Sequence, residues 1–319
     1  MSGAQEMQRI TAGKKLSSRC RDRSKGGLFT MRYTIGLSIC IFTLFPQSSN
    51  ADEAGVSFWL PGFFGSLAAT PLVPGFAIAS VSYHTPMRAA GDVTFARQVA
   101  RGDITGNFNG NLNAHLAADV TLVMTIPSYT FAQPFLGGQA SVSLAIPYGY
   151  SRVGVDATLT GTLDMMPGFT ISGSRTDTVT GFGDLIPQFN VRWNSGSHNF
   201  MTYLSGNLTV GAYDPTRFAN IGIGHNVIDA GGAYSYFNPQ TGREWSATLG
   251  FTYNFENPRT QYQNGIDMHL DVGASQFVTK QLQIGLVGYA YQQLSCDSGV
   301  GNRLGCFESR VFGIGPQIG

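Results

Sequence analysis

Apolar and polar residues alternate strictly along residues 244–256 of the chain. The apolar positions of this stretch are Trp245, Ala247, Leu249, Phe251, Tyr253 and Phe255. Residues 266–275 repeat the pattern, with Ile266, Met268, Leu270, Val272 and Ala274 as the apolar set. A period of two places the two sets on opposite faces of a β-strand.

These stretches are longer than the strands of soluble domains, which usually hold about five or six residues. A tilted strand needs about ten residues to cross a membrane, with its apolar face on lipid and its polar face on the lumen. The pattern therefore predicts consecutive spans of an outer-membrane β-barrel.

The whole chain predicts an all-β fold, an antiparallel transmembrane barrel over residues 75–319 with about ten strands visible. We expect strands at residues 75–85, 112–126, 139–146, 183–193, 199–211, 227–237, 244–255, 266–279, 282–294 and 307–319. Residues 148–177 are ambiguous, because they either extend the third strand or form a long loop. The chain stops at FGIGPQIG without the terminal aromatic residue usual in such barrels. We therefore expect a C-terminal truncation, and about 12 strands in a complete barrel.

Short and long connections alternate between the expected strands. Residues 194–198 and 280–281 are short connections, whereas residues 212–226 and 295–306 are long ones. Barrels of this class have short periplasmic turns and long extracellular loops. We therefore expect the N-terminus in the periplasm and residues 295–306 outside the cell.

The N-terminal residues predict export. Residues 31–51 have a basic start, a short apolar run and small residues before a cleavage position after Ala51, as in a secretory signal peptide. Residues 1–30 read as a non-native or mis-annotated extension, the alternative being a real extended n-region. Residues 52–74 are apolar and broken by Gly and Pro. They predict either a hatch inside the lumen or a cap at its periplasmic end.

Composition narrows the class of protein further. Only 12% of the residues are charged, about half the usual share in a soluble domain. Residues 52–319 hold a single lysine, Lys280, so nothing forms the basic patch that nucleic acid requires. The chain has no apolar run of 18 residues or more, which excludes helical membrane spans.

Polar side chains on the alternating strands are candidates for lining the lumen. They are Gln188, Asn190, Arg192, Asn207, Glu244, Asn254, Asp267, His269 and Asp271. The last three share one strand face, where alternate residues lie about 6.5–7 Å apart. One metal ion would struggle to bind all three, so a metal or catalytic site is the less favoured interpretation. The chain has no nucleophile elbow and no phosphate-binding loop, and we expect no cofactor.

Aromatic residues near the strand ends predict an interfacial girdle, with substrate stacking as the alternative. They are Trp193, Trp245, Tyr253, Phe255, Tyr289 and Tyr291. Cys296 and Cys306 flank a glycine-rich loop, which in an exported protein predicts a loop-closing disulfide. Two free thiols are the alternative.

The sequence from Thr180 onward resembles the outer-membrane family named for the meta-pathway of phenol degradation. The motifs that carry the resemblance are TGFGD at 180–184 with Pro187, Trp193 and His198, then GREWS at 242–246, NFENPRTQY at 254–262, NGIDMHLD at 264–271 and GYAYQQ at 288–293. A weaker likeness extends back to about residue 75. The resemblance implies a porin-like channel for hydrophobic compounds and brings no catalytic residues.

We therefore expect a monomeric barrel in the outer membrane of a Gram-negative bacterium, in contact with lipid and lipopolysaccharide. Its expected function is passive, selective uptake of small hydrophobic or aromatic solutes linked to aromatic catabolism. The alternatives are a barrel enzyme resembling an outer-membrane lipase and a structural or adhesive barrel with a plugged lumen. A lipase-like enzyme requires a serine and a histidine in hydrogen-bond contact.

Overall fold

The computed structural model describes residues 57–101, 104–163, 168–302, 306 and 308–319. These residues belong to one compact unit, Gln47–Gly319. The expected extension at 1–30 and the expected signal peptide at 31–51 lie outside the described residues. No helix in the described ranges is long and apolar enough to cross a membrane.

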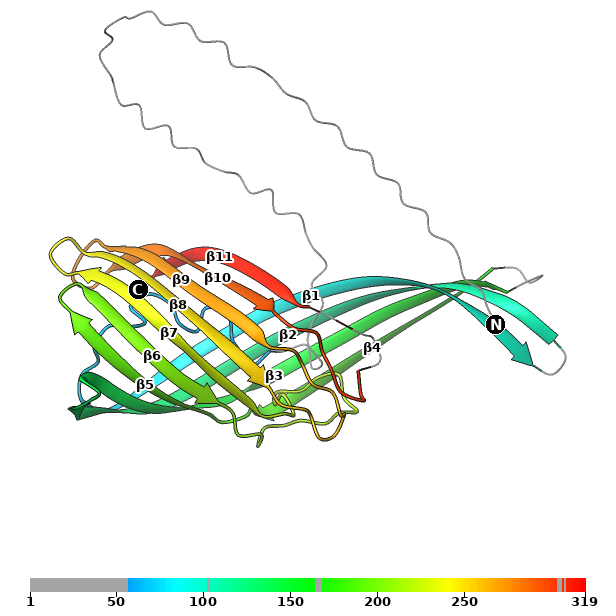
Figure 1. Ribbon diagram of the computed structural model, residues 1–319. Helices are drawn as coiled ribbons and strands as arrows, with labels where there is room; N and C mark the ends of the chain where they lie inside the picture. Colours follow the sequence, from blue (N-terminus) through cyan, green and yellow to red (C-terminus); the bar gives the residue numbers. More distant parts are fainter. Residues whose placement is uncertain (1–56, 102–103, 164–167, 303–305, 307) are drawn as a thin grey trace, which may run out of the picture. The chain divides into compact units, whose positions relative to one another are not determined.

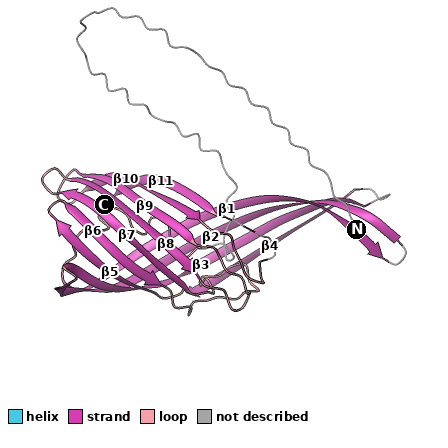
Figure 2. Ribbon diagram, viewed as in Figure 1, coloured by secondary structure: helices cyan, strands magenta, loops and turns pink. Residues whose placement is uncertain are grey.

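The described chain forms one antiparallel sheet of eleven strands, curled into a half-barrel (Figures 1 and 2). The strands are β1 (Gly75–Arg101), β2 (Ile104–Phe135), β3 (Gly138–Leu163), β4 (Phe169–Phe182), β5 (Ile186–Ser195), β6 (His198–Gly206), β7 (Val227–Asn238), β8 (Arg243–Asn254), β9 (Asp267–Phe277), β10 (Gln283–Gln293) and β11 (Arg310–Ile318). Their order in the sheet is β1-β2-β3-β5-β6-β7-β8-β9-β10-β11, and β4 pairs with β3. The predicted fold class is confirmed.

The ambiguous residues 148–177 extend β3 and then form most of a strand, β4, that the sequence pattern did not separate from a loop. The first half of β3 pairs with β5, through Gln139–Arg192 to Ala145–Ile186. Its second half pairs with β4, from Tyr148–Phe182 to Gly161–Phe169. Strands β4 and β5 therefore lie one after the other along the same side of β3. Counted across the sheet, ten strands follow one another in chain order, and β4 lies off this path.

Strands β1, β2 and β3 are much longer than the predicted 75–85, 112–126 and 139–146. They hold 27, 32 and 26 residues, so they extend beyond β5–β11 together with β4 (Figure 1). The prediction followed stretches of apolar alternation, and in β2 the apolar set from Leu112 to Met124 lies on the inward face. On the extension the outward face is polar, with Arg88, Asp119 and Arg152 on neighbouring strands.

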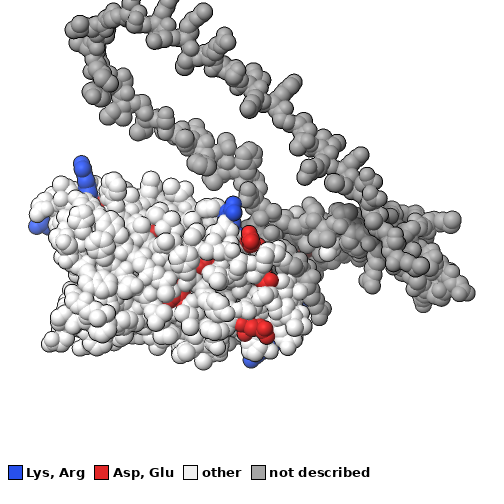
Figure 3. Space-filling view, viewed as in Figure 1, with Lys and Arg blue, Asp and Glu red and all other residues white. Residues whose placement is uncertain are grey.

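The polar face of the sheet is turned inward, opposite to the arrangement in a soluble protein. Along β8, Glu244, Ser246, Thr248, Thr252 and Asn254 are all buried. The intervening apolar residues are on the outer face, where Trp245 is 64% exposed. In Figure 3 most of the described surface is uncharged, and the few Lys and Arg side chains in view project near its ends.

Three residues of the expected aromatic girdle face outward as predicted: Trp245, Tyr253 and Phe255 are exposed. The outward position predicted for Tyr289 and Tyr291 is wrong, because they lie opposite Asp271 and His269 on the inner face. Glycine and apolar residues occupy both faces of β10, so its sequence gave no clear alternation from which to assign them.

The connections differ between the two ends of the strands. At one end, which we call the short-turn rim, two-residue turns join β2 to β3 at Leu136–Gly137 and β5 to β6 at Gly196–Ser197. Leu136, Gly137 and Gly196 have positive φ angles, as tight hairpin turns require. At the opposite end of the strands, which we call the long-loop rim, lie the connections 207–226, 255–266 and 294–309.

Candidate functional site

The candidate site is the contact between residues 57–74, which we call the inner segment, and the inward face of the sheet. Sheet side chains accept hydrogen bonds from backbone N–H groups of this segment. Gly62 N and Phe64 N donate to the two carboxylate oxygens of Asp271 in β9, at 2.9 and 3.1 Å. A short segment without regular structure needs such partners, since buried backbone groups must be paired.

The next turn of the inner segment is held in the same way by β7 and β8. Leu67 N donates to Glu244 Oε1 at 2.9 Å and to Ser246 Oγ at 3.0 Å. Ala69 N donates to Ser235 Oγ at 3.0 Å. The side chains that bind Leu67 and Ala69 also contact one another, because the hydroxyl of Ser246 bonds to both Glu244 and Ser235.

The segment is anchored at its far end by a reciprocal amide pair. Leu72 N donates to Gln139 Oε1 at 2.8 Å, and Gln139 Nε2 donates to Leu72 O at 2.7 Å. The inner segment thus contacts side chains from strand β3 and from strands β7, β8 and β9. Polar inward faces that a soluble protein would leave in water here bind a piece of backbone.

Aromatic packing adds an apolar contribution to the same contact. The Trp59 ring stacks on His269 of β9, with centroids 3.6 Å apart and planes 12° apart. Phe64 lies 5.0 Å from the ring of Tyr203 in β6. Trp59, Phe64 and Tyr203 belong to a buried cluster with Ala69, Met201 and Ala233. The inner segment therefore supplies much of the apolar core inside the curled sheet.

Beneath Trp59, a fully buried histidine pairs with a fully buried aspartate. His269 Nε2 lies 2.8 Å from Asp229 Oδ2, and Thr252 Oγ1 donates to the same oxygen at 2.6 Å. Gly250 makes room for this arrangement: a Cβ there would lie 2.0 Å from Tyr203 Oη and 2.3 Å from His269 Cε1.

All nine polar residues that the sequence singled out lie on the inward face, but in separate groups. Glu244, His269 and Asp271 contact the inner segment directly. Arg192 contacts Asn190, Ser141 and, at 3.4 Å, the carbonyl of Ala68. Asn254 donates to Asp267 Oδ2 at 2.7 Å, Asn207 donates to Asp184 Oδ2 at 3.1 Å, and Gln188 lines a pocket described below.

Sequence reasoning missed Trp59, Tyr203, Asp229 and Ser235. Asp229 and Ser235 share a face of β7 with alternate burial, so counting residues along the predicted strand 227–237 would have placed them inward. No sequence signal pairs Trp59 with His269, because 210 positions separate them.

The three residues Asp267, His269 and Asp271 do not converge on one point. Asp267 bonds to Asn254, His269 to Asp229, and Asp271 to the inner segment. Within the described ranges, the one group of three potential ligands at metal-binding distance is Cys296, Cys306 and Glu308. Cys296 and Cys306 are joined in a disulfide there, and disulfide sulfurs are not the thiolates that bind metals.

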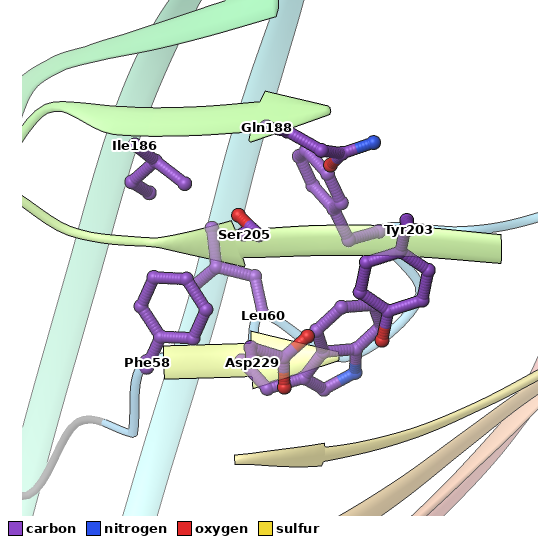
Figure 4. Close-up of a pocket in the computed structure, with 9 residues that line it drawn as sticks. Phe58, Leu60, Ile186, Gln188, Tyr203, Ser205 and Asp229 are labelled. Atoms are coloured by element: carbon purple, nitrogen blue, oxygen red, sulfur yellow. The ribbon is translucent and has the colours of Figure 1, made fainter. Parts of the chain in front are cut away.

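A small pocket opens between the inner segment and strands β5, β6 and β7. Its lining includes Phe58, Trp59, Leu60, Gln188 and Tyr203, and Figure 4 shows the labelled side chains gathered from these elements. Its volume is about 20 Å³, enough for roughly one water molecule. A benzene ring needs far more space, so this pocket does not hold one.

Four of the histidines in the described ranges make side-chain hydrogen bonds to other residues. His84, His198, His225 and His269 contact Thr121, Tyr234, Asn254 and Asp229, respectively. None of these four partners is a serine.

Comparison with known proteins places the chain in a family. A search of the curated proteins finds no match. The family model described as "Putative MetA-pathway of phenol degradation" matches residues 101–319, which include everything from the tip of β1 to the end of β11. The chain therefore belongs to this family.

Proposed function

We propose that the protein is an outer-membrane channel for passive, selective uptake of small hydrophobic and aromatic molecules, and that the inner segment closes its lumen. The barrel fold and the family fit an outer-membrane protein linked to aromatic catabolism. The observation that carries the proposal is the pairing of an apolar outer face with a polar inner face that binds the segment 57–74.

The outer face supports insertion in lipid, because strands β5–β11 expose bulky apolar side chains. Phe200, Leu204, Trp245, Leu249 and Phe251 are exposed there. In water such a surface would be an aggregation liability. In a bilayer these side chains contact lipid. Strands β6 and β8, which carry them, lose no backbone hydrogen bonds there, because each is paired with a neighbour on both sides.

The inner face supports gating by the inner segment. Its contacts are hydrogen bonds from backbone N–H groups to side chains, together with aromatic packing, and none of them is covalent. Displacing the segment exposes polar groups that water can solvate, so an open state is accessible. A solute then binds weakly near the long-loop rim and leaves through the lumen.

An adhesive barrel with a permanently plugged lumen is the rival that the same contacts favour. It differs from the channel in allowing no solute flux. Flux measurements therefore separate the two functions.

The test is uptake of radiolabelled toluene and of a labelled small sugar into proteoliposomes with a lipopolysaccharide-containing outer leaflet. That leaflet is needed because small aromatics cross phospholipid unaided. We expect faster toluene entry than in protein-free vesicles, without a matching rise for the sugar. Equal rises would indicate a general pore, and no rise for either would favour the adhesive barrel.

A further inference from the structure

The part of the sheet that extends beyond β5–β11 reverses the polarity of the barrel wall. On its outward face, Asn113 pairs with Thr158, His115 with Asp156, and Asp119 with Arg152. On its inward face, Leu112 pairs with Leu159, Ala114 with Ala157, Leu116 with Val155, and Ala118 with Val153. Lipid-facing chemistry is thus absent from the outside of the extension, and an apolar surface lies on its inside.

This inward surface continues without interruption into the barrel. Every even-numbered residue of β2 from Leu112 to Met124 is apolar, and alternate residues share one face of a strand. Leu112 is 36% exposed, whereas Ala118, Val120, Leu122 and Met124 are all buried. Twelve residues of strand cover roughly 40 Å. One apolar stripe therefore runs from an accessible surface to the interior of the curled sheet.

The long connection 207–226 covers this stripe where the extension meets the barrel. Ala219 is fully buried against Ala118 of β2 and Val153 of β3. Arg217 Nη2 binds Asp177 Oδ1 of β4 at 2.7 Å, and the N–H groups of Phe218 and Ala219 donate to Asp177 Oδ2. The connection is therefore fastened directly beside the stripe.

We propose that the stripe is a binding track for small hydrophobic solutes, which adsorb on the extension and move along β2 and β3 to the barrel, where residues 207–226 form a seal. The proposal builds on the uptake function by assigning the path of entry. Continuity decides the occupant: a surface meant for lipid would face outward, whereas this one leads inward to Leu122 and Met124, which are buried.

On strands β2 and β3 the inward residues from Leu112–Leu159 to Ala118–Val153 are all aliphatic. Strand β4 borders the track with Arg175 and Asp177, which lie beside Val155 and Val153 on the same face. Binding over β2 and β3 therefore depends on apolar area, not on hydrogen bonds. We expect it to accept unsubstituted hydrocarbons such as toluene or naphthalene as well as phenols, and to reject sugars.

Photolabelling of the full-length protein in lipid nanodiscs with benzophenone tests the track without requiring transport. We expect adducts on peptides containing residues 112–118 and 153–159, reduced by excess toluene. The double variant Leu112→Ser and Leu159→Ser should lower these adducts roughly tenfold, since it removes two large apolar side chains. The matched control is Asn113→Ser with Thr158→Ser, the adjacent pair on the outward face, which should label as the wild type does.

Adducts confined to the outward residues of β5–β11, or equal labelling of both double variants, would overturn the track. Cross-links between the inward faces of two copies, with a dimer in sedimentation, would assign the stripe to self-association and overturn it as well. Labelling of the stripe without toluene uptake would retain the track and reject the channel. Toluene uptake without labelling of the stripe would retain the channel and reject the track.

Discussion

The indole of Trp59 lies flat on the imidazole of His269, with ring centroids 3.6 Å apart, and 210 positions of sequence separate the two residues. The imidazole is held at its edge by Asp229, whose Oδ2 lies 2.8 Å from Nε2. A strand side chain that is held in place by its neighbours gives a segment without regular structure a rigid surface to bind. This contact makes the position of the inner segment depend on the wall of the barrel.

Replacing Trp59 with Ala should open the lumen. Loss of a buried Trp side chain typically costs about 3–5 kcal/mol, which here weakens binding of the inner segment and favours its displaced state. We expect a higher single-channel conductance in planar bilayers than for the wild type. Removal of residues 55–69 should raise conductance further.

Trp245→Ala is the matched control for Trp59→Ala, because it removes the same side chain from the outer face of β8, where it is 64% exposed. Its conductance should equal that of the wild type. Unchanged conductance after Trp59→Ala and after the deletion would reject the gating role of the inner segment.

Asp271→Asn should loosen the same segment by a different route. The carboxylate accepts hydrogen bonds from both Gly62 N and Phe64 N, whereas an Asn side chain offers one oxygen and turns an N–H group towards the second donor. Hydrogen bonds to charged groups contribute about 1.5–3 kcal/mol each. We expect faster cleavage within residues 57–74 by a protease added to the folded protein.

The comparison for Asp271→Asn is Asp156→Asn, which makes the same chemical change on the outward face of β3. Cleavage of the inner segment should not change in that variant. If the two variants are cleaved at the same rate, the hydrogen bonds to Asp271 do not hold the segment.

Gly250→Ala should destabilise the sheet, although Ala is usually the better residue in regular structure. Its Cβ would overlap Tyr203 Oη and the His269 ring, and both side chains are confined by the packing around Trp59. Overpacking of a core typically costs about 1–3 kcal/mol. Thermal unfolding followed by circular dichroism should show a lower midpoint than for Gly173→Ala, where a Cβ meets nothing within 4 Å.

The sequence predicted the barrel because alternation is a local property. Trp245 and Glu244 differ in polarity and are neighbours, so a strand must place them on opposite faces, and nothing distant changes that. The nine polar candidates could be assigned to the inward face by the same count. Their partners could not, because hydrogen bonds such as those from Gly62 and Phe64 to Asp271 depend on how the sheet curls.

The extension was missed for a related reason. A search for apolar faces of lipid-facing length ends strand β2 near Ile126 and starts it near Leu112, yet it continues to Ile104 and Phe135. A strand outside a bilayer needs no apolar face of a fixed length. The ends of β2 are therefore set by its pairing with β1 and β3, which the types of its residues indicate only weakly.

Acid should loosen the seal formed by residues 207–226, because carboxylates fasten it. Asp177 binds Arg217 and the N–H groups of Phe218 and Ala219, and Asp184 accepts hydrogen bonds from the N–H groups of Gly211 and Ile223. Arg217 holds the pKa of Asp177 well below its ordinary value of 3.8, chiefly through their hydrogen bond. A lowered pKa means that the contact contributes fully above that ordinary value and is lost as pH falls through the lowered one. Hydrogen exchange, expressed as protection factors for residues 212–226, should be constant from pH 8 to about 5 and fall in stronger acid. Asp177→Asn should lower protection of the Phe218 and Ala219 amides at pH 7 and remove their acid dependence, since both donate to Asp177. Asp119→Asn, on the outward face, should change neither. Acid dependence of these two amides that persists in Asp177→Asn would assign it to another carboxylate, such as Asp184.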